Sequence, residues 1–212
     1  MYTKYPKTFH LPWSPGLQND DRRFEHIEHL RGKRLVVTEK MDGENTSLYA
    51  DRTHARSIDS IHHVSRDWVK SFHGTIAHEI PNGWRICGEN LYAKHSIGYN
   101  NLPSYFMAFS VWDDTNTALS WDDTVMFCTM LNIHTVPVLW RGPFEEFIEI
   151  HGRFDQLASE TVEGYVVRVE DAFAFAEFEK SVAKYVRKNH VQTDVHWMRA
   201  AVVPNKLKDD VQ

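Results

Sequence analysis

Residues 34–45, which read RLVVTEKMDGEN, contain the clearest local pattern in this chain of 212 residues. The first six are rich in apolar and β-branched residues, which is typical of a strand, and Asp42-Gly43 is a turn dipeptide that would end it. Lys40 therefore lies at the end of a rigid strand. Its amine becomes a nucleophile if burial or a nearby cation lowers the lysine pKa from about 10.4 toward neutrality. The alternative interpretation is a surface lysine before a hairpin turn.

Apolar and turn patterns on both sides of this stretch predict an α+β chain with much antiparallel sheet. Helices are expected over residues 22–30, 62–80 and 120–131, where Ser120 and Asp123 form a capping box, and from Pro143 onward. Further strands are expected over residues 46–50, 84–91, 105–112, 135–140, 164–169 and 182–187. The strands come in clusters and do not alternate strictly with helices, which favours the α+β class.

The composition excludes several classes of protein. No apolar run reaches the roughly 18 residues of a membrane span, and the N-terminus lacks the apolar stretch of a signal peptide. Cys87 and Cys128 are in apolar surroundings, so we expect reduced core thiols in a cytoplasmic protein. The net charge of -5 argues against a protein that coats nucleic acid non-specifically, although an enzyme with its cations in one cleft remains compatible with it.

Later segments contain side chains that together could bind a nucleoside triphosphate. Glu89 lies in an otherwise apolar strand, where a carboxylate is costly unless it pairs with a donor such as a ribose hydroxyl or with a cation. Residues 105–113 alternate aromatic and smaller side chains, so one face can stack a purine. Glu163 begins another strand, and Lys184 brings a cation into the next. These are the components for binding and cleaving a nucleoside triphosphate without a P-loop.

In the order and character of these segments, residues 35–188 resemble the covalent nucleotidyltransferase superfamily of ligases and mRNA capping enzymes, and within it the ATP-dependent RNA ligase family. The resemblance implies a nucleotidyltransferase (ATP-grasp-like ligase adenylation) fold, with antiparallel sheets flanked by helices. It implies one adenylation domain over residues 1–212, with an irregular segment over about 1–33 and a short C-terminal tail. We expect no appended OB-fold or helical domain, because only about two dozen residues follow Lys188.

The resemblance also implies the residues of the reaction. Lys40 matches the nucleophile that accepts AMP, Glu163 the glutamate near the catalytic metal, and Lys184 the lysine that contacts the α-phosphate. The family's last motif has a second lysine where this chain has Val186. The neighbouring Arg187 or Lys188 could supply that cation.

Four more residues match positions that bind the nucleotide. Glu39 matches a residue that borders the adenine pocket, and Arg56 an arginine that contacts the nucleotide and the 5′-phosphate end. Glu89 matches the ribose-binding glutamate, and Phe109 the aromatic side chain that stacks on adenine. Ser110 departs from the family, which often has an acidic residue there.

The implied cofactors are ATP, as the AMP donor, and Mg²⁺ or Mn²⁺. The implied partner is RNA, or an RNA-containing nicked duplex, with 5′-phosphate and 3′-hydroxyl ends; no membrane and no obligate protein partner is inferred. Candidate substrate contacts are Arg52, Arg56, Lys94, His95, Arg187 and Lys188.

Three alternatives remain open. The first is an mRNA-capping guanylyltransferase, which would use GTP. The second is a catalytically silent module that binds nucleic-acid ends. The third takes His190 and His196 as metal ligands, although no cysteine or second pair completes such a site.

Overall fold

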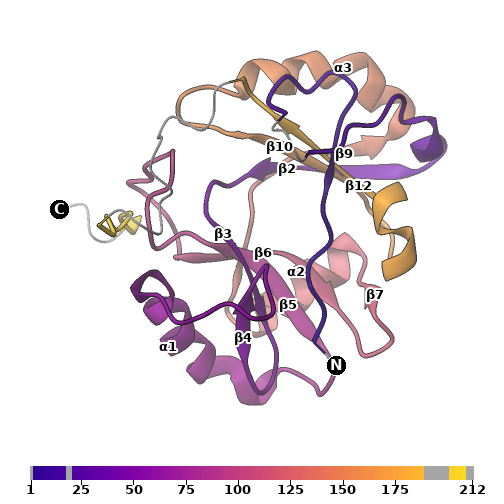
Figure 1. The fold of residues 1–212 in the computed structure, drawn as a ribbon. Helices are drawn as coiled ribbons and strands as arrows, with labels where there is room; N and C mark the ends of the chain where they lie inside the picture. The colour runs from indigo at the N-terminus through magenta and orange to yellow at the C-terminus, as the bar shows by residue number, and fades with distance from the viewer. Residues whose placement is uncertain (1, 18–20, 189–200, 209–212) are drawn as a thin grey trace. The chain divides into compact units, whose positions relative to one another are not determined.

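The structure is a computed structural model that describes residues 2–17, 21–188 and 201–208 (Figure 1). The chain divides into two units. The first, here called the Lys40 unit, contains Pro6–Met41 and Val136–Gln192, and the second, the Glu89 unit, contains Met1–Tyr5, Asp42–Thr135 and Thr193–Gln212. The expectation of a single domain over residues 1–212 stays a prediction.

A five-stranded sheet forms the centre of the Lys40 unit, in the order β1-β12-β10-β2-β9. Its strands are β1 (Phe9–His10), β12 (Val182–Val186), β10 (Gly164–Val169), β2 (Arg34–Lys40) and β9 (Val138–Pro143). All neighbours are antiparallel except β1 and β12, which are parallel. The α+β class with antiparallel sheets is confirmed, and the strands predicted around Lys40, Gly164 and Lys184 agree with the structure to within one residue.

Helix α3 (Phe144–Leu157) covers one face of this sheet (Figure 1). Aromatic rings fill the contact: Trp140 and Phe147 lie 6.2 Å apart between ring centroids, and Phe154 and Tyr165 lie 5.8 Å apart. The sequence predicted Pro143 as the first residue of this helix. In the structure Pro143 is the N-cap, and α3 begins at Phe144. The unit also contains the short strand β11 (Phe173–Ala174) and the 3₁₀ helix η4 (Phe175–Lys180).

The helix predicted over residues 22–30 is wrong except for its last turn, the 3₁₀ helix η1 (Glu28–Leu30). The residues before it are extended and bonded to β1: His10 N–H donates to the Arg22 carbonyl over 2.7 Å, and Phe24 N–H donates to the His10 carbonyl over 2.9 Å. These bonds satisfy the backbone without a helix, so local helical patterning does not decide the conformation here.

The Glu89 unit is built on a second sheet, in which β7, β6, β5, β3 and β4 follow one another and β8 pairs with β6. The bounds are β3 (Glu44–Leu48), β4 (Thr53–Ala55), β5 (Arg85–Asn90), β6 (Phe106–Trp112), β7 (Thr117–Ala118) and β8 (His134–Thr135). The strand predicted over residues 135–140 is wrong as one element. It is interrupted at Pro137, which has no backbone N–H to donate.

Two helices pack in this unit. Helix α1 (Asp67–Ile76) lies between the 3₁₀ helices η2 (Val64–Arg66) and η3 (Ala77–Glu79), and together these elements confirm the helical segment predicted over residues 62–80 to within two residues. Helix α2 (Trp121–Met130) begins at the predicted cap, where Ser120 Oγ accepts from Asp123 N–H over 3.1 Å. The buried core includes Leu48, Val69, Ile86, Phe106, Val111 and Cys128.

The hairpin predicted at Asp42-Gly43 as the alternative reading of Lys40 is wrong. Strand β2 pairs with β10 and β9, whereas β3 pairs with β4 and β5, so the two strands that flank the dipeptide belong to different sheets. Gly43 is required by close approach instead: a Cβ there would lie 2.6 Å from the Asn90 carbonyl oxygen and 3.0 Å from the Glu89 Cγ. Among the described residues, no helix has the length and apolar character needed to cross a membrane.

We predict that Gly164→Ala destabilises the protein by about 1–3 kcal/mol, because its Cβ would lie 2.0 Å from the Tyr185 carbonyl oxygen in the β10–β12 ladder. The matched control is Gly152→Ala in α3, where an added Cβ meets no atom within 4 Å. This control is expected to gain about 0.5–1 kcal/mol from helix propensity. Chemical denaturation of both variants measures the difference. A Gly164→Ala variant as stable as the parent would contradict this account of the strand pairing.

Candidate active site

The Lys40 ammonium is paired with the Glu163 carboxylate, with 2.6 Å between Nζ and Oε2. Lys40 is the last residue of β2 and stands opposite Gly164, the first residue of β10, so Glu163 lies beside it. The Glu163 side chain is 5% exposed and that of Lys40 is 25% exposed. A charge as buried as Glu163 requires a partner, and Lys40 supplies one while still open to solvent on one side.

Lys184 lies on the same face of this sheet as Lys40. It stands opposite Val166, which stands opposite Thr38, two residues before Lys40 on β2. Burial is the main cause that lowers the pKa of Lys184, and the positive charge of Lys40 lowers it further, whereas the Asp21 and Glu163 carboxylates raise it. Two lysines predicted from separate segments are thus brought together, with a carboxylate beside each.

Strand alternation places Glu39 on the other face of the sheet, in the row of Tyr165 and Tyr185. Burial raises the pKa of this carboxyl group. The structure therefore does not bring the Glu39 side chain into the cluster of Lys40, Glu163 and Lys184, and its predicted place at the adenine pocket stays a prediction.

The position of the family's second lysine is on the Lys40 face, but it is filled by a buried apolar residue. Val186 stands opposite Gly164 in the row of Lys40 and is 2% exposed. Arg187 is half-buried and donates its backbone N–H to the Glu163 carbonyl over 3.0 Å, and Lys188 is exposed. Whether Arg187 or Lys188 replaces the missing lysine stays a prediction.

Sequence reasoning missed Asp21 and His10. Lys184 Nζ donates to Asp21 Oδ1 over 3.2 Å, and His10 Nε2 lies 3.0 Å from Asp21 Oδ2. Asp21 lies in a polar segment with no periodicity, and β1 has only two residues. No local pattern could have identified either residue.

In the Glu89 unit, Phe109 is the extra residue of a β-bulge. The register between β5 and β6 shifts so that Cys87 faces Ser110 and Gly88 faces Ala108, leaving Phe109 without a residue opposite it. Bulges re-aim side chains. The half-buried Phe109 ring meets the ring of Tyr5 nearly edge-on, 5.1 Å away between centroids. Glu89 is half-buried on β5, opposite Asn45 and Met107.

The arginines expected to contact substrate differ in their availability. Arg56 is exposed directly after β4, and among the residues that the structure describes it has no hydrogen-bond or ion-pair partner. Arg52 lies 4.4 Å above the Tyr2 ring and donates to the Ile58 carbonyl over 3.1 Å, so it is engaged locally. Arg56 is therefore the freer of the two cations.

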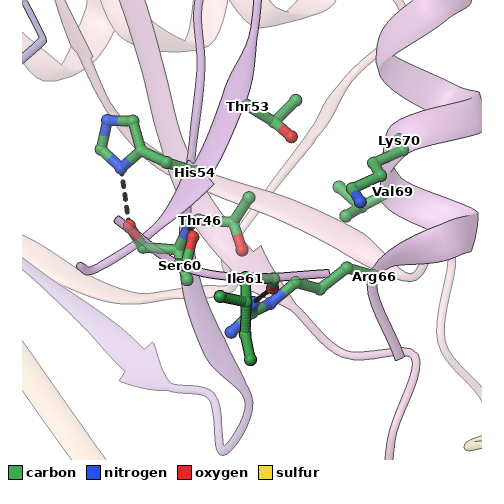
Figure 2. A pocket seen from close by; sticks show the side chains of 9 residues that line it. Thr46, Thr53, His54, Ser60, Ile61, Arg66, Val69 and Lys70 are labelled. Carbon is green, nitrogen blue, oxygen red and sulfur yellow. Dashed lines mark hydrogen bonds between the residues drawn. The ribbon is translucent and has the colours of Figure 1, made fainter. Parts of the chain in front are cut away.

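The loop after Arg56 folds over a small pocket lined by Thr46, Thr53, His54, Ala55, Ser60, Ile61, Arg66, Val69 and Lys70 (Figure 2). The Arg66 guanidinium donates to both Glu44 oxygens and to the Ile61 carbonyl. This cation is thus used to fasten the loop to β3. We therefore assign no anion site to this pocket, because the Arg66 guanidinium that lines it is engaged by Glu44 and Ile61.

Asp42 holds the loop that contains Lys94 and His95. Its Oδ2 accepts from the backbone N–H groups of Ser96 and Ile97, over 2.8 Å and 2.7 Å. Asp42, two residues after Lys40, thus holds the loop that carries two of the predicted substrate contacts, Lys94 and His95. Lys94 is exposed and His95 is half-buried.

Within the described residues, no group of three or more His, Cys, Asp or Glu side chains could hold a metal ion. A magnesium site that uses one carboxylate together with substrate phosphates and waters does not require such a group. Glu163 fits that kind of site, since its carboxylate lies beside two lysines that suit a phosphate. His190 and His196 lie outside the described residues.

The family model for RNA ligase matches residues 33–186. An archaeal ATP-dependent RNA ligase has a similar structure, with a TM-score of 0.59, 19% identity, and coverage of 88% of this chain and 48% of that one. The Naegleria gruberi RNA ligase with PPi gives a TM-score of 0.54 and 20% identity, covering 86% and 57%. A lysine-to-alanine variant of the Naegleria enzyme, with ATP and Mn, gives 0.51 and 18%, covering 76% and 51%.

A search of curated proteins returned no match. The chain spans about half the length of the solved structures that it resembles. At this level of identity the structural similarity establishes the nucleotidyltransferase fold that these ligases share. Because the family model covers most of its length, the chain belongs to the RNA ligase family.

Proposed function

We propose that this protein is an ATP-dependent RNA ligase in which AMP becomes attached to Lys40. The observation that carries the proposal is the pair of Lys40 and Glu163, 2.6 Å apart, with Lys184 on the same face of the sheet. An amine on a rigid strand beside a second cation suits attack on a phosphate, since catalysis at phosphorus depends on positioning and charge neutralisation. Membership of the RNA ligase family supports the same reaction.

The reaction proceeds in three steps, each an in-line displacement at phosphorus. The Lys40 amine attacks the α-phosphorus of ATP and expels pyrophosphate, which leaves a lysine–AMP phosphoramidate. AMP then passes to a 5′-phosphate end, and a 3′-hydroxyl finally displaces AMP to form the phosphodiester. Lys184 offsets the negative charge on the α-phosphate as its non-bridging oxygens gain charge.

Glu163 is the residue proposed to hold Mg²⁺ or Mn²⁺. A bound divalent cation would lower the repulsion between the nucleophile and the phosphate. Neighbouring structures of the Naegleria ligase with ATP or AMP and Mn support this cofactor class. Glu163 would then contact the metal or its waters in place of Lys40, and the Lys40 nitrogen would be able to attack once its ammonium had lost a proton to solvent.

The adenosine part of ATP is assigned to the four residues that match the family's nucleotide contacts. Phe109 stacks on adenine and Glu89 holds the ribose, while Glu39 borders the base and Arg56 contacts the nucleotide and the 5′-phosphate end. The position of Phe109 in a β-bulge supports its role, and so does the exposure of Arg56, whose guanidinium has no partner among the residues that the structure describes.

RNA is the proposed polynucleotide, with Arg56, Lys94, His95, Arg187 and Lys188, and more weakly Arg52, as its contacts. The whole chain carries -5, so binding must rely on local cations. A cytoplasmic location is part of the same proposal.

Lys40→Ala is expected to abolish the covalent AMP adduct, because Lys40 is the amine that is paired with Glu163 on the face that carries Lys184. The measurement is incubation with α-labelled ATP and a denaturing gel, on which the parent protein gives an acid-labile, base-stable band. Lys180→Ala, an exposed lysine on η4, is the control and should label normally. Labelling of Lys40→Ala would remove Lys40 as nucleophile. Better labelling with GTP would favour a capping guanylyltransferase, and no labelling of the parent a silent end-binding module.

Phe109→Ala is expected to raise the KM for ATP by about tenfold or more, since aromatic stacking contributes roughly 1–3 kcal/mol per base. Phe109→Tyr keeps the ring and should have a small effect. Initial rates of adduct formation across an ATP series measure both variants. Equal KM values for the parent and the alanine variant would exclude stacking on this ring.

Removal of divalent cations with EDTA should stop adduct formation and sealing, and added Mg²⁺ or Mn²⁺ should restore both. Glu163→Ala should slow adduct formation by at least about tenfold while the circular dichroism spectrum is retained. Glu170→Gln is the control, because Glu170 pairs with Arg34 and Arg141 and should affect stability alone. Near-normal rates for Glu163→Ala would take Glu163 out of the site.

Sealing should be weak, strongly dependent on salt, and best when RNA supplies the 3′-hydroxyl. Binding that relies on local cations weakens as salt rises, by roughly 0.7 to 0.9 in log K per tenfold rise in salt for each phosphate neutralised. Nicked duplexes of all-RNA, mixed and all-DNA composition, compared across a salt series, measure the preference. Joining that ignores salt, or that favours all-DNA nicks, would contradict the assignment of RNA as substrate.

A further inference from the structure

Asp21 lies between Lys184 and the buried His10. Lys184 Nζ donates to Asp21 Oδ1 over 3.2 Å, and the His10 Nε2 is 3.0 Å from Asp21 Oδ2. The His10 ring N–H does not point straight at that oxygen, so this contact is mainly electrostatic. The side chains of Asp21 and Lys184 are 12% and 18% exposed, and that of His10 is fully buried.

His10 is in turn held by Ser14, which is bonded to the strand that carries Lys184. His10 Nδ1 and Ser14 Oγ are 2.7 Å apart, and Ser14 Oγ accepts from the backbone N–H of Val186 over 3.0 Å. The connection therefore begins at Val186 on β12, passes through Ser14, His10 and Asp21, and ends at the Lys184 side chain on the same strand.

The charges of His10, Asp21 and Lys184 indicate which of these groups donates and which accepts. Burial, followed by the positive charge of Lys184, lowers the pKa of His10 to about 4, so the ring is neutral near pH 7. A carboxylate only accepts hydrogen bonds, so the proton of the neutral ring belongs on Nε2, facing Asp21, and Nδ1 accepts from the Ser14 hydroxyl. Ser14 contacts the His10 ring, the ring places its Nε2 3.0 Å from one Asp21 oxygen, and the other Asp21 oxygen accepts from Lys184.

Register supports the same conclusion. His10 on β1 stands directly opposite Lys184 on β12, so His10, Lys184, Val166 and Thr38 form one row across the sheet. His10 and Asp21 thus supply groups beside Lys184, on the face of the sheet that carries Lys40.

We propose that Asp21, oriented by His10 and Ser14, is the positioning residue that fixes the Lys184 ammonium toward the phosphate that Lys40 attacks. The proposal rests on the proposed function for its effect on the reaction, but the link between Asp21 and Lys184 can be tested without any activity. Without the Asp21 charge, Lys184 keeps its place on β12 but loses the contact that holds its end.

The test uses Asp21→Asn, which keeps the shape of the side chain and removes its charge, with Asp155→Asn as the matched control. Asp155 is also partly buried, but it accepts from Tyr165 on the α3 face of the sheet. The first readout is acylation of Lys184 across a pH series, followed by mass spectrometry. Because Asp21 raises the pKa of Lys184 against the effect of burial, its loss should move the labelling midpoint of Lys184 to lower pH, with Lys180 unchanged.

The second readout is the rate of AMP transfer to Lys40 at saturating ATP. We expect Asp21→Asn to lower this rate by about tenfold with a much smaller change in the KM for ATP, and Asp21→Glu to recover part of it. His10→Asn should reduce the rate in the same direction, and thermal unfolding separates this from loss of folded protein.

Each result decides one part of the proposal. An unchanged labelling midpoint in Asp21→Asn would overturn the link to Lys184 whatever the enzyme does. A shifted midpoint with a parental rate of AMP transfer would overturn the positioning role. A parent protein that forms no adduct, together with a shifted midpoint, would instead refute the proposed function and leave the link to Lys184 intact.

Discussion

The ion pair of Lys40 and Glu163 sets the main constraint on the Lys40 unit. A carboxylate that is 5% exposed is tolerable only with a cation at bonding distance, and Lys40 Nζ is 2.6 Å away. This contact requires β2 and β10 to be paired with Lys40 opposite Gly164, and β10 to lie close against β12. The absence of a side chain at Gly164 permits that approach, so the ion pair and the glycine both depend on the register of these three strands.

The sequence predicted most of the long strands and helices α1, α2 and α3, and it failed at the short strands and at the irregular segment before η1. Strands such as β2 and β10 are dense in β-branched residues and alternate in a way that few other conformations satisfy. The segment before η1 was predicted wrongly because its backbone groups bond to β1. The bonds join His10 to Arg22 and Phe24, which are distant from His10 in the sequence. There, backbone hydrogen bonds to a distant strand determine the conformation, although the side chains follow a helical pattern.

Candidate residues could be predicted where a charged side chain lies in or next to a recognisable strand. They could not be predicted where their position depends on a segment that is distant in the sequence. Lys40 and Lys184 are charged residues within strands and Glu163 directly precedes one, so each can be recognised from its own segment, and strand register then brings them together. Asp21 and His10 reach Lys184 through β1, a strand of two residues that no periodicity reveals. Phe109 was chosen by resemblance, whereas the bulge that isolates it follows from the pairing of β5 with β6.

The charges on the Lys40 face are compatible with the phosphate site that we propose for this acidic chain. Lys40 and Lys184 contribute two positive charges, Glu163 and Asp21 contribute two negative ones, and His10 is neutral near pH 7, so the formal sum is zero. Such a cluster is stable without ligand because each lysine has a carboxylate. Binding of a phosphate is then favoured when the phosphate replaces a carboxylate as the partner of a lysine. It is also favoured when a divalent cation binds a carboxylate and leaves its lysine unpaired. Nucleotide and metal should therefore each raise the affinity for the other. The nucleotide pairs with the lysines and releases their carboxylates, and the metal binds a carboxylate and releases its lysine.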